Sequence, residues 1–359
     1  MSGDSGRRRP SSDRLRHRRS VRTLGASALL ATLALGAAAC GSGGAEMGGG
    51  SGAGMPVTAA PTTTTTVPIE ARPVRVTAAP WSLATAIQRE GLVTDGTSIF
   101  LAGGLDRSSV SQSAVLKIDP ANGASAQVGT LAVAVHDTQA VWRDGTIVVV
   151  GGGSPPIRTE VQSVVPGGAA KVIGQLPHDR ADHVVAQVGS TLYALGGVDQ
   201  ASNLDGTVAA STDGGVTWKQ VGTLAQAVRY SGVGVLDGQI YLLGGVASAS
   251  GADTAAIQRF DPKTNQTTVV GQLPQAFSHP TSVQMGPLVF LAGGFVANAR
   301  VTKVQRVDLR SLTTVDTGAV LPAPMSDGAG VVIGGTAYLV GGEGSDGKAS
   351  TAVSLLTLG

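Results

Sequence analysis

Six polar or ionisable residues of this sequence recur at one fixed distance from a repeated glycine pair. Each lies 14 positions before the first glycine of its pair, in a chain of which only 14% is charged. Carboxylates, guanidinium groups, an imidazole and a phenol at one register could bind a polar ligand, hold a metal ion or transfer protons. The six residues are Arg89, Asp137, Asp182, Tyr230, His279 and Asp327.

Three neighbouring residues extend this set: His136 and Arg229 lie one position before the register, and His183 lies one position after it. The sequence leaves three interpretations open. The polar side chains could simply cap strand ends beside solvent. They could bind a sugar, a peptide or another envelope component, with Arg89, Arg229 and Tyr230 as donors and aspartates as acceptors. They could also form a metal or catalytic centre from the aspartates and histidines.

The spacing of these residues argues against several kinds of chemistry. Candidate ligands on separate repeats form no compact metal motif, so we expect no metal ion and no other cofactor. The glycine pairs form no phosphate-binding loop, because no helix start follows them. A binding function is therefore better supported than an enzymatic one.

The glycine pairs mark a sequence repeat. Their first residues are 48, 45, 48, 49 and 48 positions apart, and each pair follows an apolar run such as IFLA or IYLL. A constant period with strand-like runs and turn residues predicts a repeat architecture. The fourth repeat contains four such runs, and Asp237-Gly238 favours a tight hairpin between the first two. We predict an all-β fold over residues 72–359, a six-bladed β-propeller with four-stranded antiparallel blades.

These repeats resemble the kelch repeat, in which an apolar strand ends in Gly-Gly and the next ends near an aromatic residue and Asp-Pro. The glycine pairs and RFDPKTNQ at 259–266 carry the resemblance, whereas the kelch Tyr and Trp are mostly absent and only Trp218 falls at the outer-strand position. The resemblance implies a kelch-type propeller that serves as a binding or scaffolding module. It also implies that Arg180 and His183, in DRADH, match the Arg-x-x-His of the repeat itself.

The last repeat ends at TAVSLLTLG, a third strand with no fourth strand after it. The segment WSLATAIQREGLV at 81–93 aligns without gaps with GTLAVAVHDTQAV at 129–141, so the residues before it stand where an outer strand belongs. We predict that about Arg72–Ala79 pairs beside Ala352–Leu358 and closes the ring with an N-terminal strand.

The stretch STDGGVTW at 211–218 resembles the Asp-box of sialidases and other propellers. In that motif the aspartate stabilises a hairpin turn and the tryptophan packs between sheets, so the resemblance implies a structural role for Asp213. A sialidase would also need an arginine cluster and a Tyr/Glu nucleophile pair, and the sequence shows no convincing set. The alternative to a binding module is a carbohydrate-active propeller enzyme, sialic-acid mutarotase-like or sialidase-like. Its site would lie at the channel mouth, the end of the propeller's central channel where we expect the register residues.

Residues 1–39 resemble a bacterial lipoprotein signal peptide. Eight arginines precede the apolar segment at 24–40, which is short for a membrane span. The ending GAAAC resembles a lipobox, with Ala37 where Leu is usual, and implies lipidation of Cys40, the only cysteine of the chain. Arg18-Arg19 leaves both the general secretory and the twin-arginine export routes open.

Residues 40–71 are rich in Gly, Ser, Thr and Pro and predict a disordered tether, either bare or with sugars on its threonines. Without residues 1–39 the chain retains 18 basic and 22 acidic residues, so we expect no nucleic-acid partner. We expect an exported monomer, anchored through Cys40 at the outer face of the cytoplasmic membrane or in the cell wall, with an unknown envelope protein or glycan as its partner.

Overall fold

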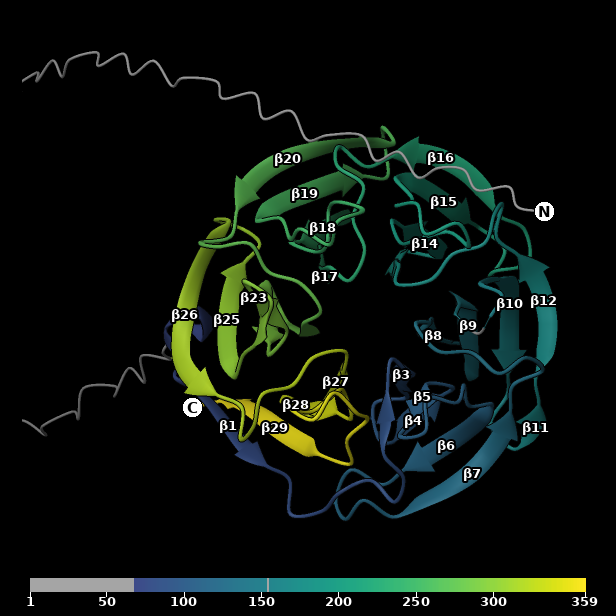
Figure 1. Cartoon of the computed structure of the whole chain (residues 1–359), viewed down its shortest axis with the longest axis horizontal. Helices are drawn as coiled ribbons and strands as arrows, with labels where there is room; N and C mark the ends of the chain where they lie inside the picture. The colour runs from purple at the N-terminus through teal and green to yellow at the C-terminus, as the bar shows by residue number, and fades with distance from the viewer. Residues whose placement is uncertain (1–67, 154) are drawn as a thin grey trace, which may run out of the picture. The chain divides into compact units, whose positions relative to one another are not determined.

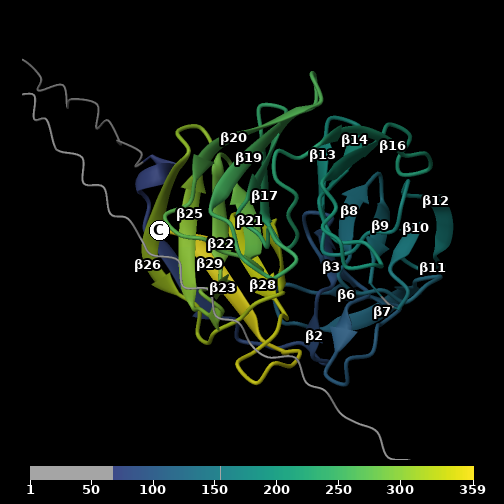
Figure 2. The same cartoon turned by 45° about the horizontal axis from the view of Figure 1, so that its top comes forward.

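Six sheets, each with four antiparallel strands, surround a central axis, with one strand of each nearest the axis and one at the periphery (Figure 1). A two-residue strand, Gly168–Ala169, adds a parallel fifth strand at the outer edge of one sheet. In the tilted view these sheets, the blades, stand side by side around the ring (Figure 2). The computed structural model describes residues 68–153 and 155–359. The predicted all-β, six-bladed, kelch-type β-propeller is confirmed.

The strands of each blade follow sequence order from the axis outward, except in the last blade. Blade 1 comprises β3 (Gly91–Thr94), β4 (Ile99–Ala102), β6 (Ala114–Ile118) and β7 (Ser125–Thr130). Blade 2 comprises β8 (Gln139–Arg143), β9 (Thr146–Gly152), β10 (Arg158–Val164) and β12 (Lys171–Gln175). Blade 3 comprises β13 (Val184–Val188), β14 (Thr191–Leu195), β15 (Thr207–Ser211) and β16 (Lys219–Thr223).

Blade 4 comprises β17 (Gly232–Leu236), β18 (Gln239–Leu243), β19 (Ala256–Asp261) and β20 (Gln266–Gln272). Blade 5 comprises β21 (Thr281–Met285), β22 (Leu288–Ala292), β25 (Lys303–Asp308) and β26 (Thr313–Val320). Blade 6 comprises β27 (Ala329–Ile333), β28 (Thr336–Val340), β29 (Val353–Leu358) and β1 (Val74–Ala78). The short elements are η1 (Ile69–Ala71), β2 (Ile87–Gln88), β5 (Leu105–Asp106), β11 (Gly168–Ala169), β23 (Phe295–Val296) and β24 (Ala299–Arg300).

Local sequence explains the first hairpin of blade 4, between β17 and β18. Asp237 and Gly238 both have positive φ, 51° and 76°, and Leu236 pairs with Gln239 across them. A two-residue loop of this kind matches the right-handed twist of the strands it joins. The Asp-Gly pair therefore sets the register of β17 against β18, as the sequence predicts.

The hydrophobic core is divided among the spaces between neighbouring blades. One cluster joins Tyr193 and Leu195 of blade 3 to Leu242 and Phe260 of blade 4, and all four side chains are buried. The other clusters are also built mainly from Val, Leu, Ile and Ala. Burial of apolar area between sheets is the main force that holds the blades together.

The glycine pairs connect each blade to the next. Gly244 and Gly245 have φ of 66° and 109°, and a Cβ on Gly244 would lie 2.4 Å from the carbonyl oxygen of Phe277. The amide of Gly245 donates to that same carbonyl at 2.7 Å. All six pairs make this bond, over 2.7–3.0 Å, so a closed circle of hydrogen bonds runs through the blades. The donors are Gly104, Gly152, Gly197, Gly245, Gly294 and Gly342, and the acceptors are Val135, Arg180, Val228, Phe277, Met325 and Ile87, respectively.

The N-terminal strand closes the ring as predicted. β1 is the outer strand of blade 6 and pairs antiparallel with β29, from Val74 opposite Leu358 to Ala78 opposite Ser354. Val74 and Val76 pack against the core cluster of blades 5 and 6. The ring is thus held by strands from both ends of the propeller sequence, which leaves β29 without an open edge.

The Asp-box has the structural role that its motif implies. The carboxylate of Asp213 accepts hydrogen bonds from Ser211 Oγ, the amide of Val216, and both the amide and the hydroxyl of Thr217. These bonds hold the pKa of Asp213 below its usual range. Trp218 is buried between blades 2 and 3 and donates its indole N–H to the carbonyl of Gly215 at 3.0 Å.

The predicted signal peptide at 1–39, the lipidation site at Cys40 and most of the tether at 40–71 lie outside the described residues. The described part begins at Pro68 and contains no helix long and apolar enough to span a membrane. Ile69 of η1 already packs against the core cluster that includes Leu356.

Candidate binding site at the channel mouth

The six register residues come together at one end of the channel and line a single cavity of about 200 Å³. All six have positive φ, between 48° and 59°. The amides of five donate to the register residue of the preceding blade over 2.9–3.2 Å, which forms a backbone belt around the axis. We call these six residues the mouth ring: Arg89, Asp137, Asp182, Tyr230, His279 and Asp327. Non-glycine residues with positive φ are uncommon, so this belt fixes where each side chain starts.

Arg89 is the centre of the charge network in the mouth ring. Its Nη1 lies 3.2 Å from Oδ2 of Asp137 and donates to the Tyr230 hydroxyl at 3.2 Å. Asp327 and Glu343 approach the same guanidinium group at 3.8 and 3.6 Å. Burial opposes the charge of Arg89, but the facing carboxylates outweigh burial and raise its pKa.

Arg229 forms a second ion pair across neighbouring blades, between its Nη1 and Oδ2 of Asp182 at 3.1 Å. The other carboxylate oxygen of Asp182 is buried and makes no hydrogen bond of normal geometry. Burial, together with the nearby charge of Asp137, raises the pKa of Asp182 well above its usual value. The guanidinium group of Arg229 also lies 5.2 Å from the centre of the Tyr230 ring.

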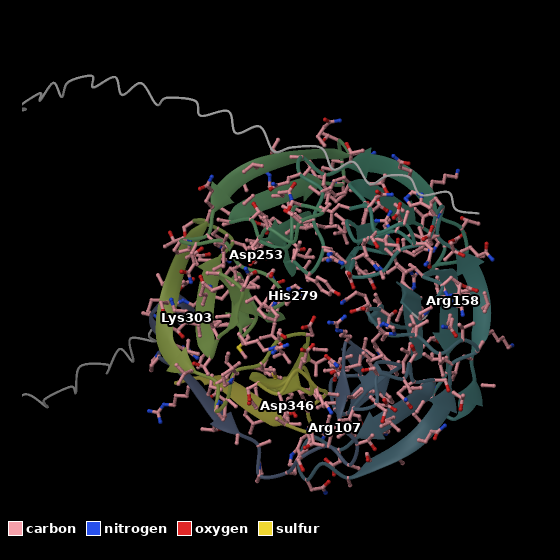
Figure 3. The ribbon with its side chains drawn as sticks, in the orientation of Figure 1. Arg107, Arg158, Asp253, His279, Lys303 and Asp346 are labelled. Atoms are coloured by element: carbon pink, nitrogen blue, oxygen red, sulfur yellow. The ribbon has the colours of Figure 1, made fainter. Side chains whose placement is uncertain are left out.

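An aromatic wall borders the cavity on the side of blades 4 and 5. The rings of Tyr230 and His279 stack with centroids 3.8 Å apart, and Phe295 meets His279 edge-on at 5.1 Å. His279 projects toward the middle of the ring, whereas Arg158 and Lys303 lie toward its outside (Figure 3). Burial lowers the pKa of His279, so this imidazole is neutral near pH 7.

Two further predicted residues support the mouth ring or lie beneath it. His136 lies 3.4 Å from Asp137 and 2.9 Å from the hydroxyl of Ser111, and burial lowers its pKa. His183 lines the cavity beneath Asp182, and burial beside Arg180 lowers its pKa to about 3. Both histidines are therefore neutral near pH 7.

The structure thus gathers the nine predicted residues at one place. Seven line the cavity, and His136 and Arg229 contact them from the rim. Arg180 is different, because it is fully buried and pairs with Asp205 at 2.7 Å while donating to the carbonyls of Gly196 and Thr207. This guanidinium group holds β14 and β15 of blade 3, which is the repeat-specific role that the kelch resemblance implies.

Sequence reasoning missed two acidic residues of the site. Glu90 lines the cavity with 2% of its surface exposed, and neither carboxylate oxygen makes a hydrogen bond of normal geometry. Burial raises the pKa of Glu90 to about 8, although the amides of Glu90 and Ala329 partly oppose this effect. Glu343 pairs with Arg300 and approaches Arg89.

Two positional signals could have found these residues. Glu90 stands one position after the register, where Thr138 and His183 also line the cavity. Glu343 follows the last glycine pair, and the residue after each pair lies beside the residue that precedes the mouth ring, as with Ser326 and Glu343. The position after a glycine pair therefore lies next to the mouth ring in the fold.

The site offers hydrogen-bond donors, acceptors and aromatic surface, and this combination suits reversible binding of a polar group. Among the described residues, no group of three or more His, Cys, Asp or Glu side chains is arranged to hold a metal ion.

Comparison with known proteins agrees with this architecture. Residues 227–270 match the family model of the kelch motif. That segment contains Tyr230 and most of blade 4, so one of the six repeats is recognisable as kelch by its sequence alone.

Curated relatives carry the same motif at low identity. Kelch-like protein 35 of Mus musculus is 25% identical over 181 residues, which is 50% of this chain and 30% of that protein. Kelch-like protein terF of Aspergillus terreus is 26% identical over 187 residues, 46% of this chain and 39% of that protein. The kelch similarity therefore spans well under half the length of either relative.

A solved structure, titled "Structure of YjhT", superposes with a TM-score of 0.64 at 15% identity. The match covers 77% of this chain and 95% of that one. At this identity the likeness concerns the fold alone, a kelch-type propeller.

Proposed function

We propose that this protein is a binding or scaffolding module of the cell envelope, and that its partner, a protein or a glycan, inserts a polar group into the channel mouth. One observation carries the proposal: the mouth ring converges on one cavity that contains buried polar atoms without a hydrogen bond of normal geometry, including Asp182 Oδ1 and Asp327 Oδ1. Buried polar groups are normally satisfied, so these atoms favour an external partner.

The proposed location rests on the sequence. A signal peptide at 1–39, a lipid on Cys40 and a tether at 40–71 would present the propeller to the envelope from the outer face of the cytoplasmic membrane. The kelch relatives support binding or scaffolding in general terms, and the envelope setting is our own extension.

A paired substitution tests the site. We expect Arg229→Ala combined with Asp182→Ala to reduce binding of the purified full chain to isolated envelope fragments at least tenfold. Because both members of the ion pair are removed, no unpaired charge is buried, and the melting temperature should change little. Arg107→Ala with Asp346→Ala is the matched control, since this pair is exposed and belongs to the loops of blades 1 and 6.

Protease or glycan-hydrolase treatment of the fragments then tells a protein partner from a glycan. If both double variants lost binding to the envelope fragments equally, or if neither lost it, the mouth would not be the binding site.

A further inference from the structure

The unsatisfied groups of the mouth are mainly hydrogen-bond acceptors. Asp182 Oδ1, Asp327 Oδ1 and both carboxylate oxygens of Glu90 are buried without a hydrogen bond of normal geometry. Their residues are 8%, 8% and 2% exposed, respectively, and all three line the cavity. A ligand that satisfies these atoms has to donate hydrogen bonds.

The positive groups of the mouth are already engaged. Arg89 pairs with Asp137, Arg229 with Asp182, and Arg300 with Glu343. The Nε atoms of Arg89 and Arg229 are buried without a hydrogen bond of normal geometry. An anionic ligand that drew these guanidinium groups toward itself would still break a partly buried ion pair, which would be costly.

Acidic groups also outnumber basic groups at the mouth. Three guanidinium groups face five carboxyl groups, and the nearby histidines are neutral near pH 7. The carboxyl groups belong to Glu90, Asp137, Asp182, Asp327 and Glu343. Burial raises the pKa of Glu90 to about 8, so this carboxyl group is mostly protonated near pH 7 in the free protein. Burial and the charge of Asp137 also raise the pKa of Asp182. A bound cation would favour the ionised form of both groups.

Part of the cavity wall suits a narrow apolar stem, although Thr138, Gln139, Ser231 and Ser282 also line the cavity. Leu92, Val184 and Val233 line it beyond the mouth ring, and the stacked Tyr230 and His279 rings border it. These aliphatic side chains offer no hydrogen bonds to the hydroxyl groups of a sugar ring, but they can cover methylene groups.

We infer that the mouth binds the cationic side chain, lysine or arginine, of a protein partner, whose positive tip approaches the carboxylate oxygens of Asp182, Asp327 and Glu90 that lack a hydrogen bond. This inference rests on the proposed function and specifies its ligand. The hydrocarbon stem would lie against the aromatic and aliphatic wall. A cavity of about 200 Å³ accommodates one such side chain.

Acetylated, amidated pentapeptides test this inference on the full chain by calorimetry or NMR titration. In the series Gly-Gly-X-Gly-Gly, X is lysine, arginine, norleucine, glutamate or glutamine. Norleucine retains the four-carbon stem of lysine without the ammonium group. We expect at least one cationic peptide to bind tenfold or more tightly than norleucine, and glutamate not to bind measurably. Glucosamine is added as a cationic sugar.

Asp327→Asn removes one carboxylate charge without changing the size of the side chain. We expect it to lower the affinity for the cationic peptide at least fivefold. Glu90→Gln is the second variant if the first fails to fold, and Asp346→Asn, an exposed acid outside the cavity, should leave affinity within twofold. The inference would be overturned if the lysine, arginine and norleucine peptides bound with equal affinity, or if the glutamate peptide bound best. It would also be overturned if glucosamine bound and none of the peptides did. Binding of envelope fragments is measured separately and tests the proposed function. Each of these peptide results would therefore contradict the inference about the ligand without contradicting the proposed function.

Discussion

Nη1 of Arg89 lies 3.2 Å from Oδ2 of Asp137, although the two residues stand one full repeat apart, in the segments that lead into blades 1 and 2. Both occupy the same position of their repeats. The repeat thus places opposite charges from neighbouring blades side by side at the channel mouth. Because Asp327 and Glu343 also face Arg89, one guanidinium group stabilises three carboxylates.

Replacing this guanidinium group should destabilise the propeller. Arg89→Gln leaves the carboxyl groups of Asp137 and Asp327 without their main counter-charge in a largely buried site. We expect a loss of about 3 kcal/mol in the free energy of unfolding, measured in urea at pH 7. Arg75→Gln, on the outer strand β1, is the control and should cost less than about 0.5 kcal/mol. A change no larger than the control would show that the ion pairs around Arg89 contribute little.

Arg180 and Arg107 form a sharper comparison, because both pair with an aspartate but differ in burial. Arg180 is fully buried against Asp205, whereas Arg107 is 56% exposed beside Asp346. Arg180→Met leaves the buried carboxylate of Asp205 without its guanidinium partner, with only His178 and the amide of Thr207 beside it, and should cost about 3–5 kcal/mol. Arg107→Met should cost less than about 1 kcal/mol. Urea unfolding of both variants measures the difference. Similar losses for the two would contradict a structural role for Arg180.

Much of the fold is predictable because the repeat determines it. The glycine pairs predict six blades, since each pair meets the carbonyl of the next blade at a distance that excludes a side chain. The incomplete last repeat predicts the closing strand β1, since β29 would otherwise have an open edge. Counting from the glycine pairs predicts the mouth ring, because equivalent positions of a propeller lie at equal heights along its axis.

The remaining features of the site depend on contacts between repeats, which the spacing within one repeat does not contain. Arg89 and Tyr230 are 141 residues apart and meet only because the ring closes. Glu90 follows Arg89 in sequence, yet its burial depends on packing against blade 6 near Ala329. The charge balance that distinguishes a cationic from an anionic ligand therefore appears only when all six blades are in place.

The buried carboxyl group of Glu90 should make stability depend on pH. Its pKa is about 8 in the folded protein against 4.5 in the unfolded chain, so the folded state holds the proton more tightly. The stabilisation is fully present below about pH 4.5 and is lost as the pH rises toward 8. Relative to Glu90→Gln, which cannot ionise, the natural protein should lose about 3–4 kcal/mol between pH 5 and pH 8. Chemical unfolding at several pH values measures this difference, and parallel curves would contradict the raised pKa.

Ring closure by β1 is tested by two truncations. Removing residues 1–67 takes away no described residue and should leave the urea midpoint unchanged. Removing residues 1–79 exposes the edge of β29 and the core residues that Val74 and Val76 cover. Blade 6 then loses its outer strand, and we expect either a loss of more than about 4 kcal/mol or aggregation through the open edge. A peptide of residues 68–79, added to the shorter chain, should restore part of the lost stability. Equal midpoints for the two truncated chains would show that the ring closes without β1.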